Sequence, residues 1–74
     1  MNLKYTVIFE RAQNNWAAYV PDLPGCMTTG QSIEETTANI REAIVGHVAT
    51  LQAYGEPVPQ PASVAAEVEV STAA

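Results

Sequence analysis

The sequence predicts an α+β protein with the element order β-β-β-α-β, in which one long helix packs across one face of a single sheet. Two observations favour strands: apolar and polar residues alternate over residues 3–10, and they alternate again over residues 62–71. A third favours the helix, because apolar residues recur at spacings of three and four between residues 33 and 54. A sheet face and a helix stripe bury each other, so one layer of each is expected.

The first three strands are expected at residues 3–10, 16–20 and 26–30 as an antiparallel meander. Asn14 and Asn15 tolerate the backbone angles of a tight turn, and the short connection makes the first two strands antiparallel. The expected core residues of the sheet face the helix. They are Tyr5, Val7, Phe9, and Trp16 or Tyr19.

A stiff corner separates the second and third strands. Pro21 and Pro24 fix φ, and Gly25 supplies the backbone freedom that the corner needs before Cys26. Asp22 is able to accept a hydrogen bond from a nearby backbone N–H. These residues explain a rigid connection, and none of them needs a catalytic or ligand-binding role to account for its presence.

The helix has clear ends in the sequence. Ser32 and Glu35 form a capping box, and Glu34 and Glu35 lie at the positive end of the helix dipole. Gly55 suits the residue after the helix, and Pro57 prevents its continuation. The helix is therefore expected over residues 33–54.

The chain after the helix is expected to be stiff and then to form a fourth strand. Prolines at 57, 59 and 61 favour an extended backbone, and residues 62–71 place Val64, Ala66, Val68 and Val70 on one face. This strand either returns to its own sheet or reaches the sheet of a second copy. One domain over 1–71 is expected, with 72–74 frayed, and a homo-dimer or higher homo-oligomer would enlarge its small core.

Charge and composition exclude several functions. The net charge is −5, with three Lys or Arg residues in all, which disfavours direct binding of nucleic acid and suits a basic protein partner. The sequence has neither a signal-peptide pattern nor an apolar run long enough for a membrane helix, so a cytoplasmic protein without membrane contact is expected. Cys26 is the single cysteine and cannot form an internal disulfide.

Catalytic chemistry is not expected. His47 lies in the apolar stripe of the helix, where a histidine usually packs, and Cys26 has no cationic neighbour in sequence to activate it. The carboxylates show no metal-ligating pattern and there is no phosphate-binding glycine loop, so no metal, cofactor or catalytic residue is predicted.

The order of these motifs resembles the HicB-like antitoxins over about residues 3–70. The resemblance rests on the run Pro21-Asp22-Leu23-Pro24-Gly25-Cys26, on Thr28-x-Gly30, on Ser32-Ile33-Glu34-Glu35 at the helix start, and on the proline segment 55–61. It implies a partial RNase H-like sheet without a working nuclease site. It also implies binding and neutralisation of a small basic HicA-type toxin, an mRNA interferase.

The resemblance further implies a toxin-binding surface at Asp22, Leu23, Glu34 and Glu35. Antitoxins of this kind usually carry a C-terminal DNA-binding domain, and the printed sequence ends at Ala74, so a stand-alone N-terminal core is expected. Two alternatives remain open: an orphan oligomeric scaffold of the same fold with no toxin partner, and a degenerate metal-dependent nuclease that would use Glu10.

Overall fold

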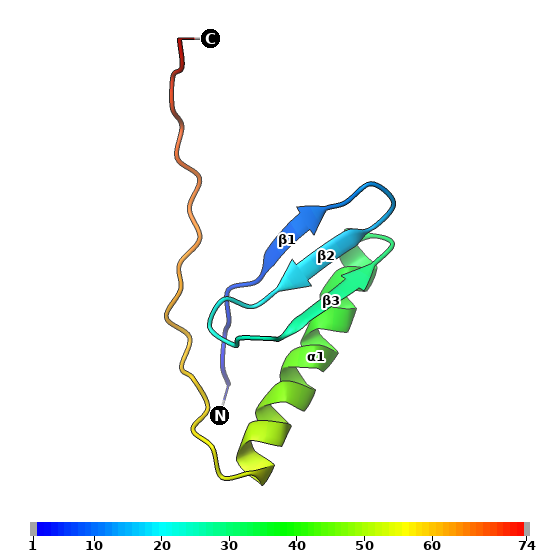
Figure 1. Ribbon diagram of the computed structural model, residues 1–74, viewed down its shortest axis with the longest axis vertical. Coiled ribbons are helices and arrows are strands. Elements are labelled where there is room, and N and C mark those ends of the chain that lie inside the picture. The colour runs from blue at the N-terminus through cyan, green and yellow to red at the C-terminus, as the bar shows by residue number, and fades with distance from the viewer. Residues whose placement is uncertain (1, 74) are drawn as a thin grey trace.

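The computed structural model describes residues 2–73 and consists of one antiparallel sheet and one helix (Figure 1). The strands are β1 (Ile8–Arg11), β2 (Trp16–Tyr19) and β3 (Met27–Gly30), in the spatial order β1-β2-β3. The helix α1 (Ile33–Ala53) follows and packs mainly against β3 and β2. The α+β class and the order of the first four elements are confirmed.

The core lies between the sheet and α1. Phe9 pairs with Ala18 across β1 and β2, so their side chains share the face that meets Ile40 of the helix. Tyr19 points to the other face and is 39% exposed, while Trp16 is half-buried with the Arg11 guanidinium 5.6 Å from its ring centroid. The fully buried apolar residues are Ala18, Val20, Leu23, Cys26 and Ile40, and the partly buried ones around them are Tyr5, Val7, Phe9, Ala43, Ile44 and Val48.

Strand β1 is shorter than the alternating pattern predicts, since it begins at Ile8 and not at residue 3. The register explains the difference: Ile8 pairs with Tyr19, the last residue of β2. Beyond it, the Val20 N–H bonds to the Cys26 carbonyl, and Pro21 has no N–H to offer. Residues 3–7 therefore continue beside the core without a strand to pair with.

The corner between β2 and β3 is confirmed as a rigid backbone feature. Three backbone hydrogen bonds close it: Val20 N–H to Cys26 O at 3.1 Å, Leu23 N–H to Val20 O at 3.1 Å, and Cys26 N–H to Leu23 O at 3.0 Å. Gly25 has a φ of +85°, a conformation that residues with a Cβ rarely adopt. The backbone of the corner is therefore held by hydrogen bonds between residues at most six positions apart.

The capping box at the start of α1 is also confirmed. The Glu35 N–H donates to Ser32 Oγ at 3.0 Å, and the Glu35 carboxylate accepts the Gln31 N–H at 2.9 Å. At the other end, Gly55 has a φ of +68° and the Glu56 N–H donates to the Leu51 carbonyl at 2.9 Å. Such a bond satisfies one of the free carbonyls of the last turn.

The fourth strand is the point at which the fold differs from the expected order. Within residues 2–73, the segment 62–71 is extended but pairs with no strand of its own chain. Figure 1 shows the chain leaving the sheet and running away from it toward the C-terminus. An alternating pattern specifies which side chains share a face, but it does not specify the strand that would pair with them.

Candidate functional site

Asp22 holds the segment that follows the helix. Its carboxylate accepts three hydrogen bonds, each of 2.9 Å, from the Ala62 N–H, the Ser63 N–H and the Ser63 hydroxyl. The two backbone bonds from Ala62 and Ser63, followed by the hydroxyl bond, hold the pKa of Asp22 below its ordinary value of 3.8. The carboxylate that was expected to meet a partner is thus engaged within its own chain.

Two further hydrogen bonds fix the same segment beside the chain that leads into β1. The Tyr5 hydroxyl donates to the Pro59 carbonyl, and the Thr6 hydroxyl donates to the Ser63 carbonyl, both at 2.6 Å. Together with Asp22 they form the tail anchor, which ends at Ser63. The sequence offered no local signal for this anchor, because its partners lie 40 to 57 positions apart.

Leu23 is not available to a partner in this structure, contrary to the expectation for this residue. Its side chain is fully buried at 0% exposure, among Ala18, Val20, Cys26 and Ile40. The corner turns Leu23 inward because its N–H bonds back to Val20 and its carbonyl accepts from Cys26. Leu23 therefore stabilises the core beneath the corner.

Glu34 and Glu35 are exposed on the first turn of α1, as expected, but the structure does not bring them next to Asp22. The corner and the helix start lie at opposite ends of β3 (Figure 1). Four strand residues span roughly 13 Å, so Asp22 and the two glutamates do not form one cluster of carboxylates, although one protein partner of ordinary size could cover both places. The surface expected from the resemblance is therefore divided into two parts.

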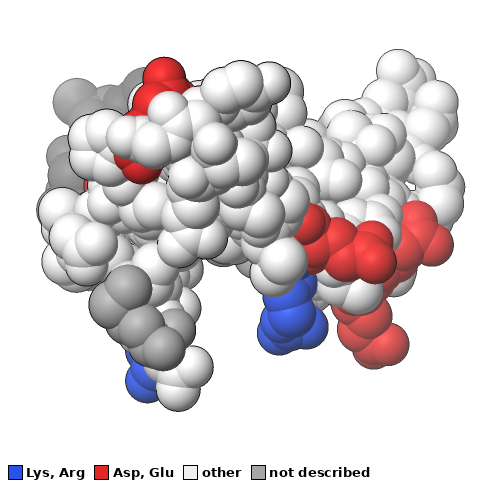
Figure 2. Space-filling model, turned by 90° about the horizontal axis from the view of Figure 1, so that it is seen from below, with Lys and Arg blue, Asp and Glu red and all other residues white. Residues whose placement is uncertain are grey.

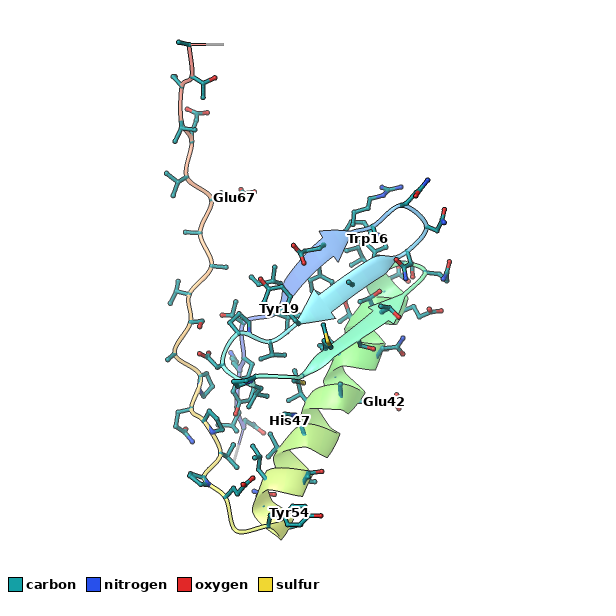
Figure 3. The ribbon with its side chains drawn as sticks, viewed as in Figure 1. Trp16, Tyr19, Glu42, His47, Tyr54 and Glu67 are labelled. Carbon is teal, nitrogen blue, oxygen red and sulfur yellow. The ribbon has the colours of Figure 1, made fainter. Side chains whose placement is uncertain are left out.

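Glu42 extends the acidic surface along the helix. It lies seven residues, about two turns, after Glu35 and hence on the same side of α1, and both side chains are exposed. Figure 2 shows acidic side chains in two separate areas of the face that it presents, the larger at the right, and Figure 3 shows Glu42 directed away from the sheet. We refer to Glu34, Glu35 and Glu42 as the acidic helix surface.

Cys26, His47 and Glu10 lie in three different environments. Cys26 is buried in the core, and this burial raises the pKa of its thiol, which disfavours the reactive thiolate. His47 is half-buried on α1 (Figure 3), and Glu10 is exposed on β1. Across residues 2–73, no three His, Cys, Asp or Glu side chains are grouped closely enough to hold a metal ion.

We predict that Asp22→Asn releases the tail anchor. An amide side chain carries no charge and places N–H groups where the carboxylate now accepts them, so the Ala62 and Ser63 amides should lose their protection from hydrogen exchange. Glu67→Gln removes a carboxylate from the exposed tail beyond the anchor and should leave both amides protected (Figure 3). Equal protection in the two variants would contradict the assignment.

The same contact predicts a pH dependence. Since the pKa of Asp22 is lower in the folded chain than in the unfolded chain, its contribution to stability is complete above the ordinary value of 3.8 and is lost as the pH falls through the lowered one. The amide NMR shifts of Ala62 and Ser63 should therefore titrate with a midpoint below 3.8. A midpoint at or above that value, or one that survives Asp22→Asn, would be inconsistent with this contact.

Comparisons with known proteins identify a family and several relatives. A family model described as "HicB_like antitoxin of bacterial toxin-antitoxin system" matches residues 5–72. A UPF0150 protein of Thermoplasma acidophilum is 37% identical over 59 residues, which cover 78% of this chain and 86% of that protein. A UPF0150 protein of Synechocystis is 39% identical over 57 residues, which cover 76% of this chain and 72% of that protein.

One relative has an antitoxin name. The protein named Antitoxin HicB 2 of Photorhabdus laumondii is 35% identical over 78 residues, which cover 90% of this chain. The match covers 56% of that antitoxin, so the chain corresponds to little more than half of its length. In the described part of this chain, no helix is both long and apolar enough to cross a membrane.

Proposed function

Because this chain belongs to the HicB-like antitoxin family, we propose that it binds and neutralises a small basic toxin of the HicA type, an mRNA interferase. The proposed role is non-enzymatic and is carried out in the cytoplasm, where such a toxin meets mRNA. The observation that supports it best is the acidic helix surface, three exposed carboxylates on one stretch of α1 in a chain of net charge −5.

Electrostatics explains how this surface would act. A protein that binds RNA presents Lys and Arg side chains to phosphates, and carboxylates are able to occupy the same side chains. Opposite charges also accelerate encounter and disfavour acidic partners. The helix surface would thus compete with RNA for the basic face of the toxin, and the negative charge of the chain makes direct binding of nucleic acid by this protein unfavourable.

Glu34 and Glu42 are the residues that we expect to carry this contact. Glu35 belongs to the same surface, but its carboxylate also accepts the Gln31 N–H in the capping box, so its replacement would disturb the helix start. Asp22 is likewise unsuitable as a probe of toxin binding because it anchors the tail. Glu34 and Glu42 are exposed, and replacing them tests the charge of the surface, although Glu34→Lys also removes a carboxylate from the positive end of the helix dipole at a cost of about 0.3 to 1 kcal/mol.

We predict that Glu34→Lys with Glu42→Lys weakens binding to a HicA-type toxin. Charge pairs across an interface contribute enough for a loss on the order of a hundredfold in affinity, measured by isothermal titration calorimetry. The control is Glu10→Lys with Glu56→Lys, which makes the same change in net charge at exposed residues outside the acidic helix surface. Circular dichroism should show the same helix content in both variants.

The two variants separate a specific surface from a general effect of charge. A large loss in the helix variant and a small one in the control would support the acidic helix surface. Equal losses would mean that net charge alone matters, and unchanged binding in the helix variant would place the toxin elsewhere.

A second candidate is an oligomeric scaffold of the same fold that has no toxin partner. The observation that favours it is the row of exposed valines in the segment after Ser63, which is suited to contact with another protein chain. Co-purification from the native host distinguishes the two: a small basic protein bound to the chain supports the antitoxin, and a homo-oligomer alone supports the scaffold.

A further inference from the structure

The face of the sheet that points away from α1, the outer face, carries an apolar row near the corner. In the register of the sheet Ile8 pairs with Tyr19 and Tyr19 pairs with Met27, so the three side chains form one row across the strands, the outer row. Their neighbours Phe9 and Ala18 face the core on the opposite side. Tyr19 is 39% exposed and Met27 is 68% exposed. In the part of the chain that the structure describes, no other helix or strand covers this row.

A hollow of about 290 Å³ extends the outer row toward the corner. Tyr19 and Met27 line it together with Pro21 and Pro24, and both prolines are exposed. Aromatic residues and methionine are enriched at the centres of protein interfaces, where a side chain of the partner enters such a hollow. The outer row therefore has the composition and the shape of an anchoring site.

The outer face carries negative charge and no positive charge. The register assigns the following strand residues to it: Ile8, Glu10, Ala17, Tyr19, Met27 and Thr29. Glu10 is exposed, and no Lys or Arg is among these residues. Arg11, the next residue, is directed to the other face, where its guanidinium lies over the Trp16 ring. A basic partner would therefore meet no repulsion from the strands of this face.

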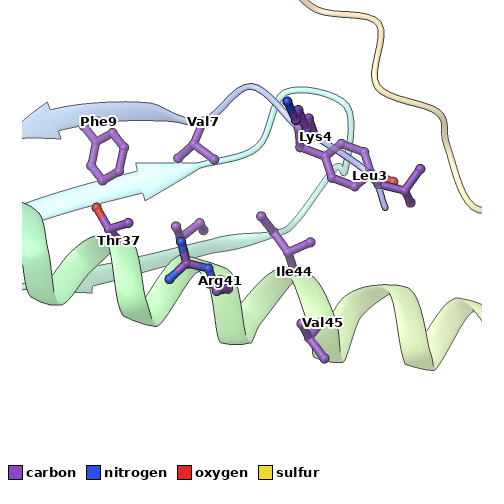
Figure 4. Close-up of a pocket in the computed structure, with 10 residues that line it drawn as sticks. Leu3, Lys4, Val7, Phe9, Thr37, Arg41, Ile44 and Val45 are labelled. Carbon is purple, nitrogen blue, oxygen red and sulfur yellow. The ribbon is translucent and has the colours of Figure 1, made fainter. Parts of the chain in front are cut away.

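The other two basic residues of the chain belong to a different surface. Lys4 and Arg41 line an apolar groove of about 450 Å³ between α1 and the chain that leads into β1, where Phe9 and Ile44 lie on opposite walls (Figure 4). These cations would repel a basic partner from the groove. Of the two apolar surfaces, the outer row is thus the one whose charge suits the proposed toxin.

The outer face continues into the acidic helix surface around β3. The Asn39 side-chain amide donates to the Thr29 carbonyl at 2.9 Å, which ties α1 to the last part of this strand. On the helix, Asn39 lies four residues after Glu35 and three before Glu42, and hence on the same side. Met27 lies two residues, roughly 7 Å, before Thr29 on β3. One partner that buries about 800 Å² on each protein is able to contact both parts.

We propose that the outer row binds an apolar patch on the basic face of the toxin, with Tyr19 and Met27 as the anchors, while the acidic helix surface pairs with the toxin's cations. Exposed ion pairs add little affinity, whereas a few anchored side chains supply most of it. This inference rests on the proposed function and adds the residues from which the complex gains most of its affinity.

Isothermal titration calorimetry with a HicA-type toxin tests the anchors. Tyr19→Ala with Met27→Ala should raise the dissociation constant on the order of a hundredfold. Because this variant removes no charge, the dependence of the affinity on salt should stay as in the unmodified chain. The control is Val45→Ala with Tyr54→Ala, which removes an aliphatic and an aromatic side chain that are 65% and 78% exposed on α1 and at its end, and it should bind normally.

A single substitution tests the same face without shortening a side chain of the central strand. Met27→Lys places a cation on the outer face at an exposed position and should weaken binding on the order of tenfold or more. Val45→Lys adds the same charge to an exposed position of α1 outside the outer row and should have a smaller effect. Circular dichroism should show the helix content of the unmodified chain in both variants.

The outcomes separate this inference from the proposed function. An unmodified chain that binds no toxin would overturn both. Normal binding by the unmodified chain and by both outer-row variants would overturn the outer row alone, and so would equal losses in the variants and their controls. Sedimentation equilibrium of the free chain covers the remaining occupant: variants that lose self-association and keep toxin binding would assign the outer row to contact between copies, against the proposal.

Discussion

Leu23→Ala is expected to lower the free energy of unfolding by about 2 to 5 kcal/mol, the range for removing a fully buried leucine side chain. Leu23 is 0% exposed and contacts the core from the corner, so its loss leaves a cavity beneath Val20 and Cys26. A 74-residue chain has a small core and correspondingly little stability in reserve. We therefore expect a large fraction of the chain to be unfolded at 37 °C, which urea titration followed by circular dichroism would measure.

Met27→Ala is the matched control for this prediction. Met27 lies just beyond the same corner, but its side chain is 68% exposed, and its truncation should change the free energy of unfolding by no more than about 0.5 kcal/mol. If the two variants were equally stable, Leu23 would not be a core residue, and its assignment to a partner-binding surface would have to be restored.

Gly30→Ala is expected to be the other strongly destabilising change. A Cβ at residue 30 would lie 2.8 Å from the Thr36 backbone nitrogen and 3.0 Å from the Thr36 Cα, distances at which the helix backbone itself must move. Overpacking of this kind costs about 1 to 3 kcal/mol, and the contact with backbone places this site at the upper end. The measurement is again the urea midpoint, because the end of β3 and the first turn of α1 would be forced apart.

Gly46→Ala is the control and should have the opposite sign. A Cβ at residue 46 meets nothing within 4 Å, and Gly46 lies inside α1, where alanine is favoured over glycine by about 1 kcal/mol. A rise in the urea midpoint for Gly46→Ala and a fall for Gly30→Ala would separate helix propensity from close packing. A Gly30→Ala protein as stable as the wild type would contradict the close approach of β3 and α1.

Features of this fold that depend on neighbouring residues could be predicted from the sequence. The hydrogen bond between Ser32 and Glu35 joins residues three apart, and the positive φ of Gly25 agrees with a glycine that directly follows Pro24 in the corner. The helix stripe likewise follows from a local period. Each of these features depends on residues that lie close together in the sequence.

Features that depend on distant residues could not be predicted. Asp22 meets Ser63 across 41 positions, and no local pattern distinguishes this contact from an aspartate that faces solvent. Thr36 weakens helix propensity, yet it is fully buried because Gly30 allows the helix to approach the sheet closely. The alternating valines after Ser63 were identified as a strand, but the alternation could not specify which edge the strand would join.

The candidate site shows the same division. The exposure of Glu34 and Glu35 follows from their position in a capping box at a helix start, which is a local property. The engagement of Asp22 with Ala62 and Ser63 depends on residues 40 and 41 positions away, which only the folded chain brings together. The corner run is therefore evidence of the family and a support of the core, and the exposed carboxylates of α1 are the better candidates for partner contact.

The most direct test of the proposed function is an RNA cleavage assay with a HicA-type toxin from the native host. The full chain should bind this protein saturably in calorimetry and should stop its RNA cleavage at the same molar ratio, and added salt should weaken both effects. Undiminished cleavage in the presence of a molar excess of the folded chain would contradict the assignment as a toxin-binding antitoxin.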